Sequence, residues 1–128
     1  MNIKNFSLLL NIAFFVYFSF QLLIFTDEFS IENIGFFNHA VAGLAEIIGI
    51  IFLSFAISLV IIFFKGLEKQ FPLFLVVFLI QFIIGMNFWR YVLTNSPGQT
   101  NLDTIALNAI LFTFVSIFSF HILVTIKK

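Results

Sequence analysis

The chain has 128 residues, of which 62% are hydrophobic and only 9% are charged, and its mean hydropathy is +1.17. Soluble domains carry about 25% charged residues, so this composition excludes an ordinary soluble fold and predicts an integral membrane protein. The formal net charge is zero and no basic tract indicates a nucleic-acid partner. Because the chain has no cysteine, disulfides and thiol-based metal sites are excluded as well.

Four apolar segments follow one another, each close to the ~20 residues that a membrane-spanning helix needs. They predict helices at about residues 6–25, 38–64, 71–93 and 104–126, in a single transmembrane domain that covers residues 1–128. The first connection, at residues 26–37, is acidic and is predicted to be a loop. Short connections make neighbouring helices antiparallel. The expected fold is therefore all-α, an integral membrane bundle of four transmembrane helices.

The basic residues near the predicted helix ends are distributed unequally between the two sides of the membrane. One side carries only Arg90, and the other carries five lysines: Lys4, Lys65, Lys69, Lys127 and Lys128. Lysine and arginine are enriched on the cytoplasmic side of membrane proteins. Both termini are therefore predicted to be cytoplasmic, which in a bacterium places the protein in the inner (plasma) membrane.

Glu46 is the most informative single residue, because it lies inside the second apolar segment. A charged side chain at such a depth costs roughly 2.5–3.5 kcal/mol on insertion scales and is a functional-site hypothesis by default. His39, Gly43 and Glu46 are spaced i, i+4, i+7 and share one helix face. The small residues of the same stretch allow close helix approach in lipid; they are Ala42, Gly43 and Gly49. Glu46 is therefore predicted to point into the bundle, and these small residues to pack against another helix.

Other polar residues fall in the same outer half of the predicted helices. Together with Glu46 and His39 they predict one polar layer, whose further members are Gln21, Asn87, Arg90 and Asn108. Within it we expect a buried ion pair between Glu46 and Arg90, with the amides filling the remaining hydrogen bonds. In the alternative, Arg90 reaches the outer headgroups and Glu46 is protonated. Gln81 faces nearly opposite to Arg90, which predicts another contact or an interface between protomers.

No catalytic motif, cofactor motif or metal-ligand cluster is evident, so no catalytic residue, cofactor or metal is predicted. Three short features, Ala42-Gly43…Gly49, Gly85…Arg90 and Pro97, give the chain a likeness to a known group. By these features, its length and its layout, the chain resembles small four-helix bacterial membrane proteins, the DoxX-like group and related families. That resemblance implies a fold and little about function.

Three functional hypotheses follow. The first is a non-catalytic accessory subunit of the membrane, with a polar layer around Glu46. The second is a small oligomeric transporter or channel that uses Glu46 as an ion or proton site. The third is a membrane enzyme acting on a lipid or quinone-like substrate. The expected partners are the lipid bilayer and, in addition, either further copies of the chain or a larger membrane complex.

Overall fold

The computed structural model describes residues 1–94 and 100–126, which form five α-helices. They are α1 (Ile3–Leu23), α2 (Thr26–Ile34), α3 (His39–Lys65), α4 (Phe71–Thr94) and α5 (Leu102–Thr125). All but α2 are long and apolar enough to cross a membrane, as the sequence predicted. Pro97, Lys127 and Lys128, which entered the sequence predictions, lie outside the described residues.

The predicted acidic loop is wrong in part, because residues 26–34 form the short helix α2. Two acidic residues in its first turn, Asp27 and Glu28, face the positive end of the helix dipole. Gly35 ends the helix with φ = 77°, a left-handed conformation that costs glycine little. Thr26 and Ser30 are buried on its inner side, so α2 packs on the bundle rather than projecting from it.

Asparagine side chains cap the N-termini of three of the long helices. Asn2 accepts a hydrogen bond from the backbone of Asn5 at 2.9 Å, and Asn38 accepts one from Val41 at 2.9 Å. Asn101 accepts from the backbone of Asp103 and of Thr104. Such caps satisfy backbone donors that have no partner within the helix, and they fix the boundaries between apolar helix and polar connection.

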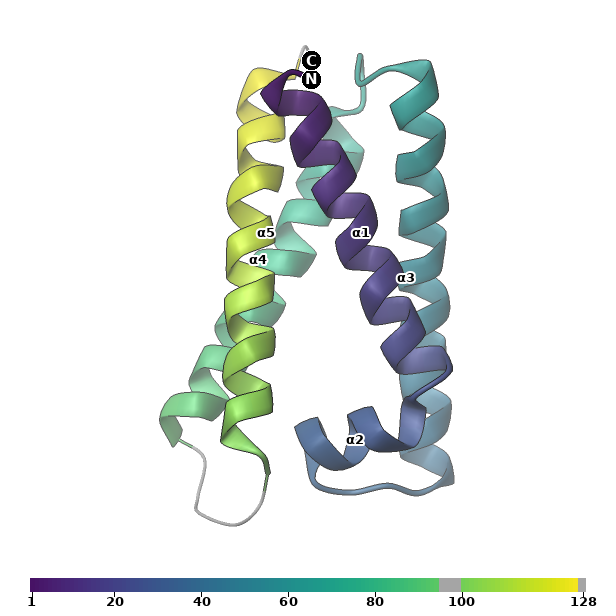
Figure 1. Cartoon of the computed structure of the whole chain (residues 1–128), viewed down its shortest axis with the longest axis vertical. Helices are drawn as coiled ribbons and strands as arrows, with labels where there is room; N and C mark the ends of the chain where they lie inside the picture. Colours follow the sequence, from purple (N-terminus) through teal and green to yellow (C-terminus); the bar gives the residue numbers. More distant parts are fainter. Residues whose placement is uncertain (95–99, 127–128) are drawn as a thin grey trace.

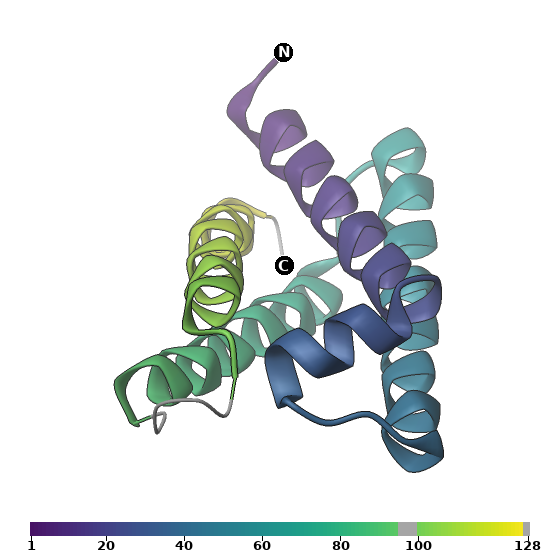
Figure 2. The same ribbon diagram turned by 60° about the horizontal axis from the view of Figure 1, so that its bottom comes forward.

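The long helices are arranged as two pairs. α1 packs along α3, and α4 packs along α5, while contacts between α1 and α5 join the pairs. Over the described residues, α3 and α4 make no close backbone contact. Figure 1 shows both chain ends at one end of the molecule and α2 at the other. Turned so that this lower end comes forward, α2 lies across the space between the two pairs (Figure 2).

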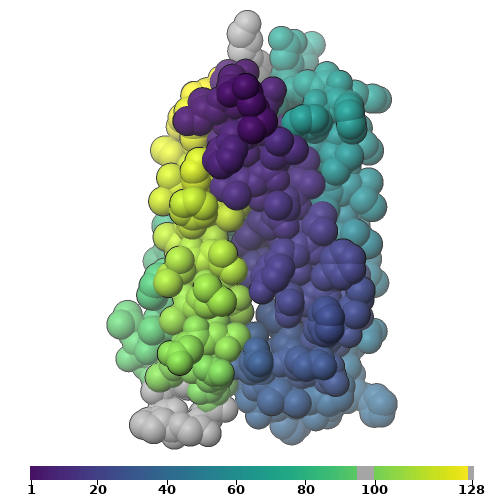
Figure 3. Space-filling model, viewed as in Figure 1, coloured from purple at the N-terminus to yellow at the C-terminus, as the bar shows by residue number. Residues whose placement is uncertain are grey.

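Aromatic rings fill the interior of the bundle, both between the two pairs and within the pair of α1 and α3. Phe112 of α5 packs against Phe14 and Phe18 of α1, with ring centroids 4.8 Å apart in each case. Phe15 of α1 meets Phe52 of α3 edge to face at 5.3 Å. In the space-filling view α1 and α5 close together over the upper half of the molecule, where the termini lie (Figure 3).

Candidate functional site

The polar centre of the molecule lies where α1, α4 and α5 meet. Asn11, Gln81 and Ser119 come from these three helices, and each is fully buried. The Gln81 side-chain amide donates to Asn11 Oδ1 at 2.8 Å. The Ser119 hydroxyl lies 2.7 Å from Asn11 Oδ1 and 2.5 Å from Gln81 Oε1. Since a hydroxyl has one proton, Ser119 donates to one of these two oxygens at a time.

A second line of hydrogen bonds ties this centre into α1. Asn11 Nδ2 donates to the backbone oxygen of Ser7 at 2.9 Å, and the Ser7 hydroxyl donates to that of Ile3 at 2.8 Å. Asn11 and Gln81 lie about 3 and 2 Å from the midpoints of their helices, at a rise of ~1.5 Å per residue. The network is uncharged, and Asn11 and Gln81 lie near the middle of helices long enough to cross a membrane, where an unsatisfied polar group is costly. It therefore serves to hold three helices in one register.

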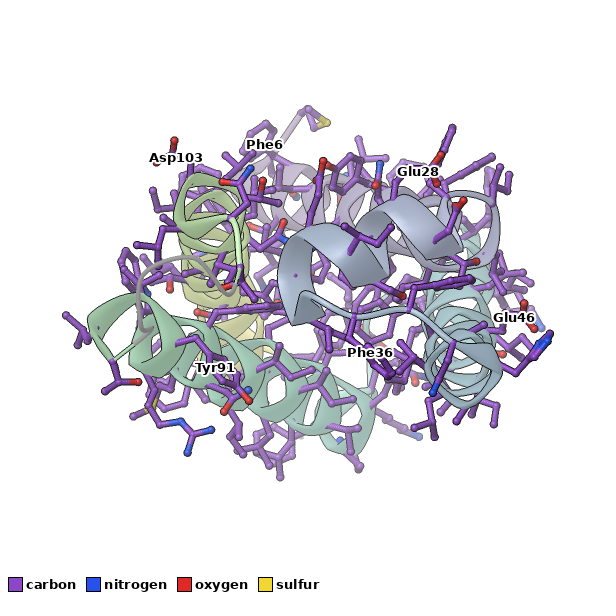
Figure 4. The ribbon with its side chains drawn as sticks, turned by 90° about the horizontal axis from the view of Figure 1, so that it is seen from below. Phe6, Glu28, Phe36, Glu46, Tyr91 and Asp103 are labelled. Carbon is purple, nitrogen blue, oxygen red and sulfur yellow. The ribbon has the colours of Figure 1, made fainter. Side chains whose placement is uncertain are left out.

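The prediction that Glu46 points into the bundle is wrong. The buried face of α3 is made by Ala45, Gly49 and Phe52, whereas Glu46 is exposed. Seen from below, Glu46 lies on the outer flank of α3 and points away from the other helices (Figure 4). One residue of helix advances ~100° around the axis, so the neighbour of buried Ala45 turns outward.

The predicted ion pair between Glu46 and Arg90 is not formed. Arg90 is exposed on α4, and no charged side chain is buried among the described residues. Its guanidinium donates to Asn87 Oδ1 at 3.1 Å and lies 5.1 Å from the centre of the Tyr91 ring. Asn87 and Arg90, two members of the predicted polar layer, are thus neighbours, but both face outward. Part of the alternative interpretation, an outward-facing Arg90, fits this geometry.

The remaining members of the predicted polar layer do not come together either. Asn108 is buried, but its amide donates to Asn33 of α2 at 2.6 Å. His39 is exposed at the first turn of α3, and Gln21 is half-buried near the end of α1. Asn108 therefore anchors α2 to α5, and the layer around Glu46 does not exist within one copy of the chain.

The small residues of α3 divide between an inward and an outward face. A Cβ added at Gly49 would lie 2.7 Å from Leu23 Cγ and 3.0 Å from Leu22 Cβ, so Gly49 packs against α1 as predicted. A Cβ added at Gly43 would meet nothing within 4 Å. Ala42 is half-buried. The prediction of close helix packing is confirmed for Gly49 and wrong for Gly43.

A groove of about 600 Å³ opens on the outer side of α4 and α5. It is lined by Phe78, Phe82, Met86, Trp89, Thr113, Ser116, Ile117 and Phe120. Its polar groups are already engaged: the Trp89 indole donates to the Thr113 hydroxyl at 2.9 Å, and Thr113 donates to the Ala109 carbonyl at 2.8 Å. The groove therefore offers apolar surface, of a kind that suits an acyl chain.

Two neighbouring carboxyl groups lie at the acidic end of the molecule, in the first turn of α2. A hydrogen bond between Asp27 and Glu28 lowers the pKa of Asp27 and raises the pKa of Glu28. Both side chains are exposed on α2. Among the described residues no group of histidine and acidic side chains is placed to hold a metal ion.

Comparisons with protein-family models, curated proteins and solved structures give no match. The role of the chain is therefore inferred from the contacts, burial and charges of its own side chains.

Proposed function

We propose that this chain is a non-catalytic accessory subunit, which acts by binding other components within the plane of the membrane. The observation that carries the proposal is the outward direction of Glu46 and Arg90. By the ~1.5 Å helical rise they lie about 9 and 11 Å from the midpoints of α3 and α4, within the hydrocarbon half-thickness of ~15 Å. A charge that faces lipid at such a depth is costly, and a partner that covers it removes that cost.

The interior of the bundle supports the same role. At its centre, the side-chain amides of Asn11 and Gln81 and the hydroxyl of Ser119 bond to one another. A satisfied, uncharged network rigidifies a bundle and specifies its packing. The transporter hypothesis needs a polar path past Glu46, and this carboxylate faces away from the interior. The accessory role is therefore favoured over transport through a single copy.

The proposed orientation has antiparallel spanning helices with both termini in the cytoplasm, and α2 at the outer face of a bacterial inner membrane. The lysine excess near one set of helix ends supports it. The likeness to DoxX-like four-helix proteins stays a prediction. The enzyme hypothesis has the groove between α4 and α5 as its most suitable surface, but the hydrogen-bonding groups that line this groove are engaged within the protein.

The proposal is tested by purification in a mild detergent followed by native mass spectrometry. We expect a stoichiometric complex, either with another membrane protein or between copies, that Glu46→Gln or Arg90→Gln weakens. The matched control is Ser54→Ala, which removes an exposed hydroxyl bonded to its own helix at Ile50. A free monomer whose reconstituted vesicles show proton flux that depends on Glu46 would overturn the accessory role.

A further inference from the structure

We infer that copies of this chain associate side by side, with Glu46 of one copy facing Arg90 of the next. The inference rests on the proposed function and names the partner, a second copy, that covers both charges. It begins from three observations. The two residues have opposite charge, both are exposed, and no ion pair joins them within one copy.

Helix geometry places the two side chains on opposite flanks of the molecule. Phe55 of α3 lines a groove together with Leu73 of α4, and Glu46 is nine residues from Phe55. Gln81 of α4 is buried at the centre of the bundle, and Arg90 is nine residues from Gln81. Nine residues are about two and a half turns of helix, so two side chains nine residues apart point to opposite sides of the helix. Glu46 therefore points away from α4, and Arg90 points away from the bundle centre.

The two charges lie at nearly the same depth. Measured from the midpoints of their helices with a rise of ~1.5 Å per residue, Glu46 is about 9 Å and Arg90 about 11 Å toward the outer side. A neighbouring copy inserted in the same orientation therefore brings its Arg90 to the level of Glu46 without a vertical shift. In hydrocarbon each charge then has a partner of opposite sign, as polar groups inside membranes require.

The side chains next to the charges also match. In neighbouring copies α3 and α4 run in opposite directions, so contact of position 46 with 90 sets 43 opposite 93 and 50 opposite 86. Gly43 leaves open space where a side chain would be, and Leu93 is 82% exposed. Ile50 and Met86 are 56% and 57% exposed. A large apolar side chain thus meets a glycine, and two apolar side chains meet one turn farther in.

The contact joins two different faces, so a pair of copies keeps one free Arg90 on the first copy and one free Glu46 on the second. Such a head-to-tail contact gives a closed ring when the rotation between copies closes, and an open row when it does not. A closed ring leaves no Glu46 or Arg90 facing lipid. An open row leaves such a charge only on its two terminal copies.

Disulfide cross-linking in native membranes tests this register, because the chain has no cysteine of its own. Two tagged chains are co-expressed, one carrying Ile50→Cys and the other Met86→Cys, and are oxidised before solubilisation. We expect a cross-linked dimer that carries both tags. Ile57→Cys is the matched control: Ile57 is also exposed and lies seven residues along the same face. It is out of register with position 86, and its cross-linked product should be about tenfold lower.

Charge variants test what holds the contact. Arg90→Gln and Glu46→Gln should each reduce the double-tagged product about tenfold or more, since a lone charge is then left without its partner. A chain with Glu46→Arg and Arg90→Glu together should recover the product, because the complementarity is restored. The inference would be overturned if no double-tagged dimer formed, or if Ile57→Cys gave as much cross-linked product as Ile50→Cys. It would also be overturned if neither Glu46→Gln nor Arg90→Gln changed the yield of that product.

The two proposals fail separately. If native mass spectrometry shows a complex with another protein but no double-tagged dimer forms, self-association is wrong and the accessory role stands. If the dimer forms and vesicles show proton flux that depends on Glu46, the accessory role is wrong and self-association stands.

Discussion

Replacing Gly49 by alanine tests how closely α1 and α3 pack. The added Cβ would lie 2.7 Å from Leu23 Cγ and 3.0 Å from Leu22 Cβ, where 3.4–4 Å is ordinary contact. Leu22 is buried and its Cβ is fixed to the backbone, so it cannot move aside alone. Gly43→Ala is the matched control on the same helix, because its Cβ would meet nothing within 4 Å.

The expected magnitude combines two opposing effects. Overpacking of a well-packed core costs about 1–3 kcal/mol, while alanine in place of glycine within a helix stabilises by roughly 0.5–1 kcal/mol. Gly49→Ala should therefore lower the free energy of unfolding by up to about 2.5 kcal/mol. Gly43→Ala should leave it unchanged or raise it by up to ~1 kcal/mol. The helix term is common to both variants, so their difference isolates the packing of α1 on α3.

The measurement is reversible unfolding in mixed micelles by titration with a denaturing detergent, on protein shown by mass to be monomeric. Helix content by circular dichroism reports the transition. Equal stability of the two alanine variants would refute the close approach of α1 and α3 at Gly49. A destabilised Gly43→Ala would refute the open outer face of α3.

Three further predictions concern the centre, the orientation and the groove. In a double-mutant cycle of Asn11→Leu and Gln81→Leu, the coupling in unfolding free energy should be about 0.6–1.7 kcal/mol, which spans the average and the largest value for hydrogen bonds between membrane helices; a coupling near zero would contradict the network. A cysteine in place of exposed Glu28 should react with an impermeant thiol reagent in intact cells, whereas one in place of exposed Glu68 should react only after permeabilisation; the opposite pattern would invert the orientation. Trp89, the single tryptophan, lines the apolar groove, so lipids with brominated acyl chains should quench its fluorescence; quenching by a water-soluble agent alone would contradict the access of lipid to the groove.

The spanning helices could be predicted from the sequence because a bilayer demands long apolar runs, and four such runs are present. The short helix α2 could not be read in the same way. Its nine residues are mostly polar, and its position depends on contacts that no local pattern contains, such as the bond between Asn33 and Asn108. A glycine at position 35 and two acids in the first turn were the available signals.

The direction of Glu46 was predicted wrongly for a physical reason. In a membrane helix the side that faces lipid is as apolar as the side that faces protein. Ile47 and Ile50 on the exposed side and Phe52 on the buried side give the sequence no contrast. The small residues were the remaining guide, and Gly49 and Gly43 lie on different faces.

The polar centre had a clearer signal in the sequence. Asn11 and Gln81 are amides near the middle of two apolar segments, where each needs a partner from another helix. The sequence predicted a further contact for Gln81, and the structure supplies Asn11 and Ser119. Which amide meets which depends on the crossing of the helices, and this is a property of the assembled bundle.

The division of the bundle into two pairs bears on how the chain assembles during synthesis. α1 and α3 can dock on each other while α4 and α5 are still being made, because they pack along each other, and the contacts of α1 with α5 form afterwards. The residues between α3 and α4 then connect two halves that have each folded locally. A gene split within this connection should yield two fragments that insert separately and find one another in the bilayer. The hydrogen bonds of Asn11 on the first fragment with Gln81 and Ser119 on the second would make their association specific.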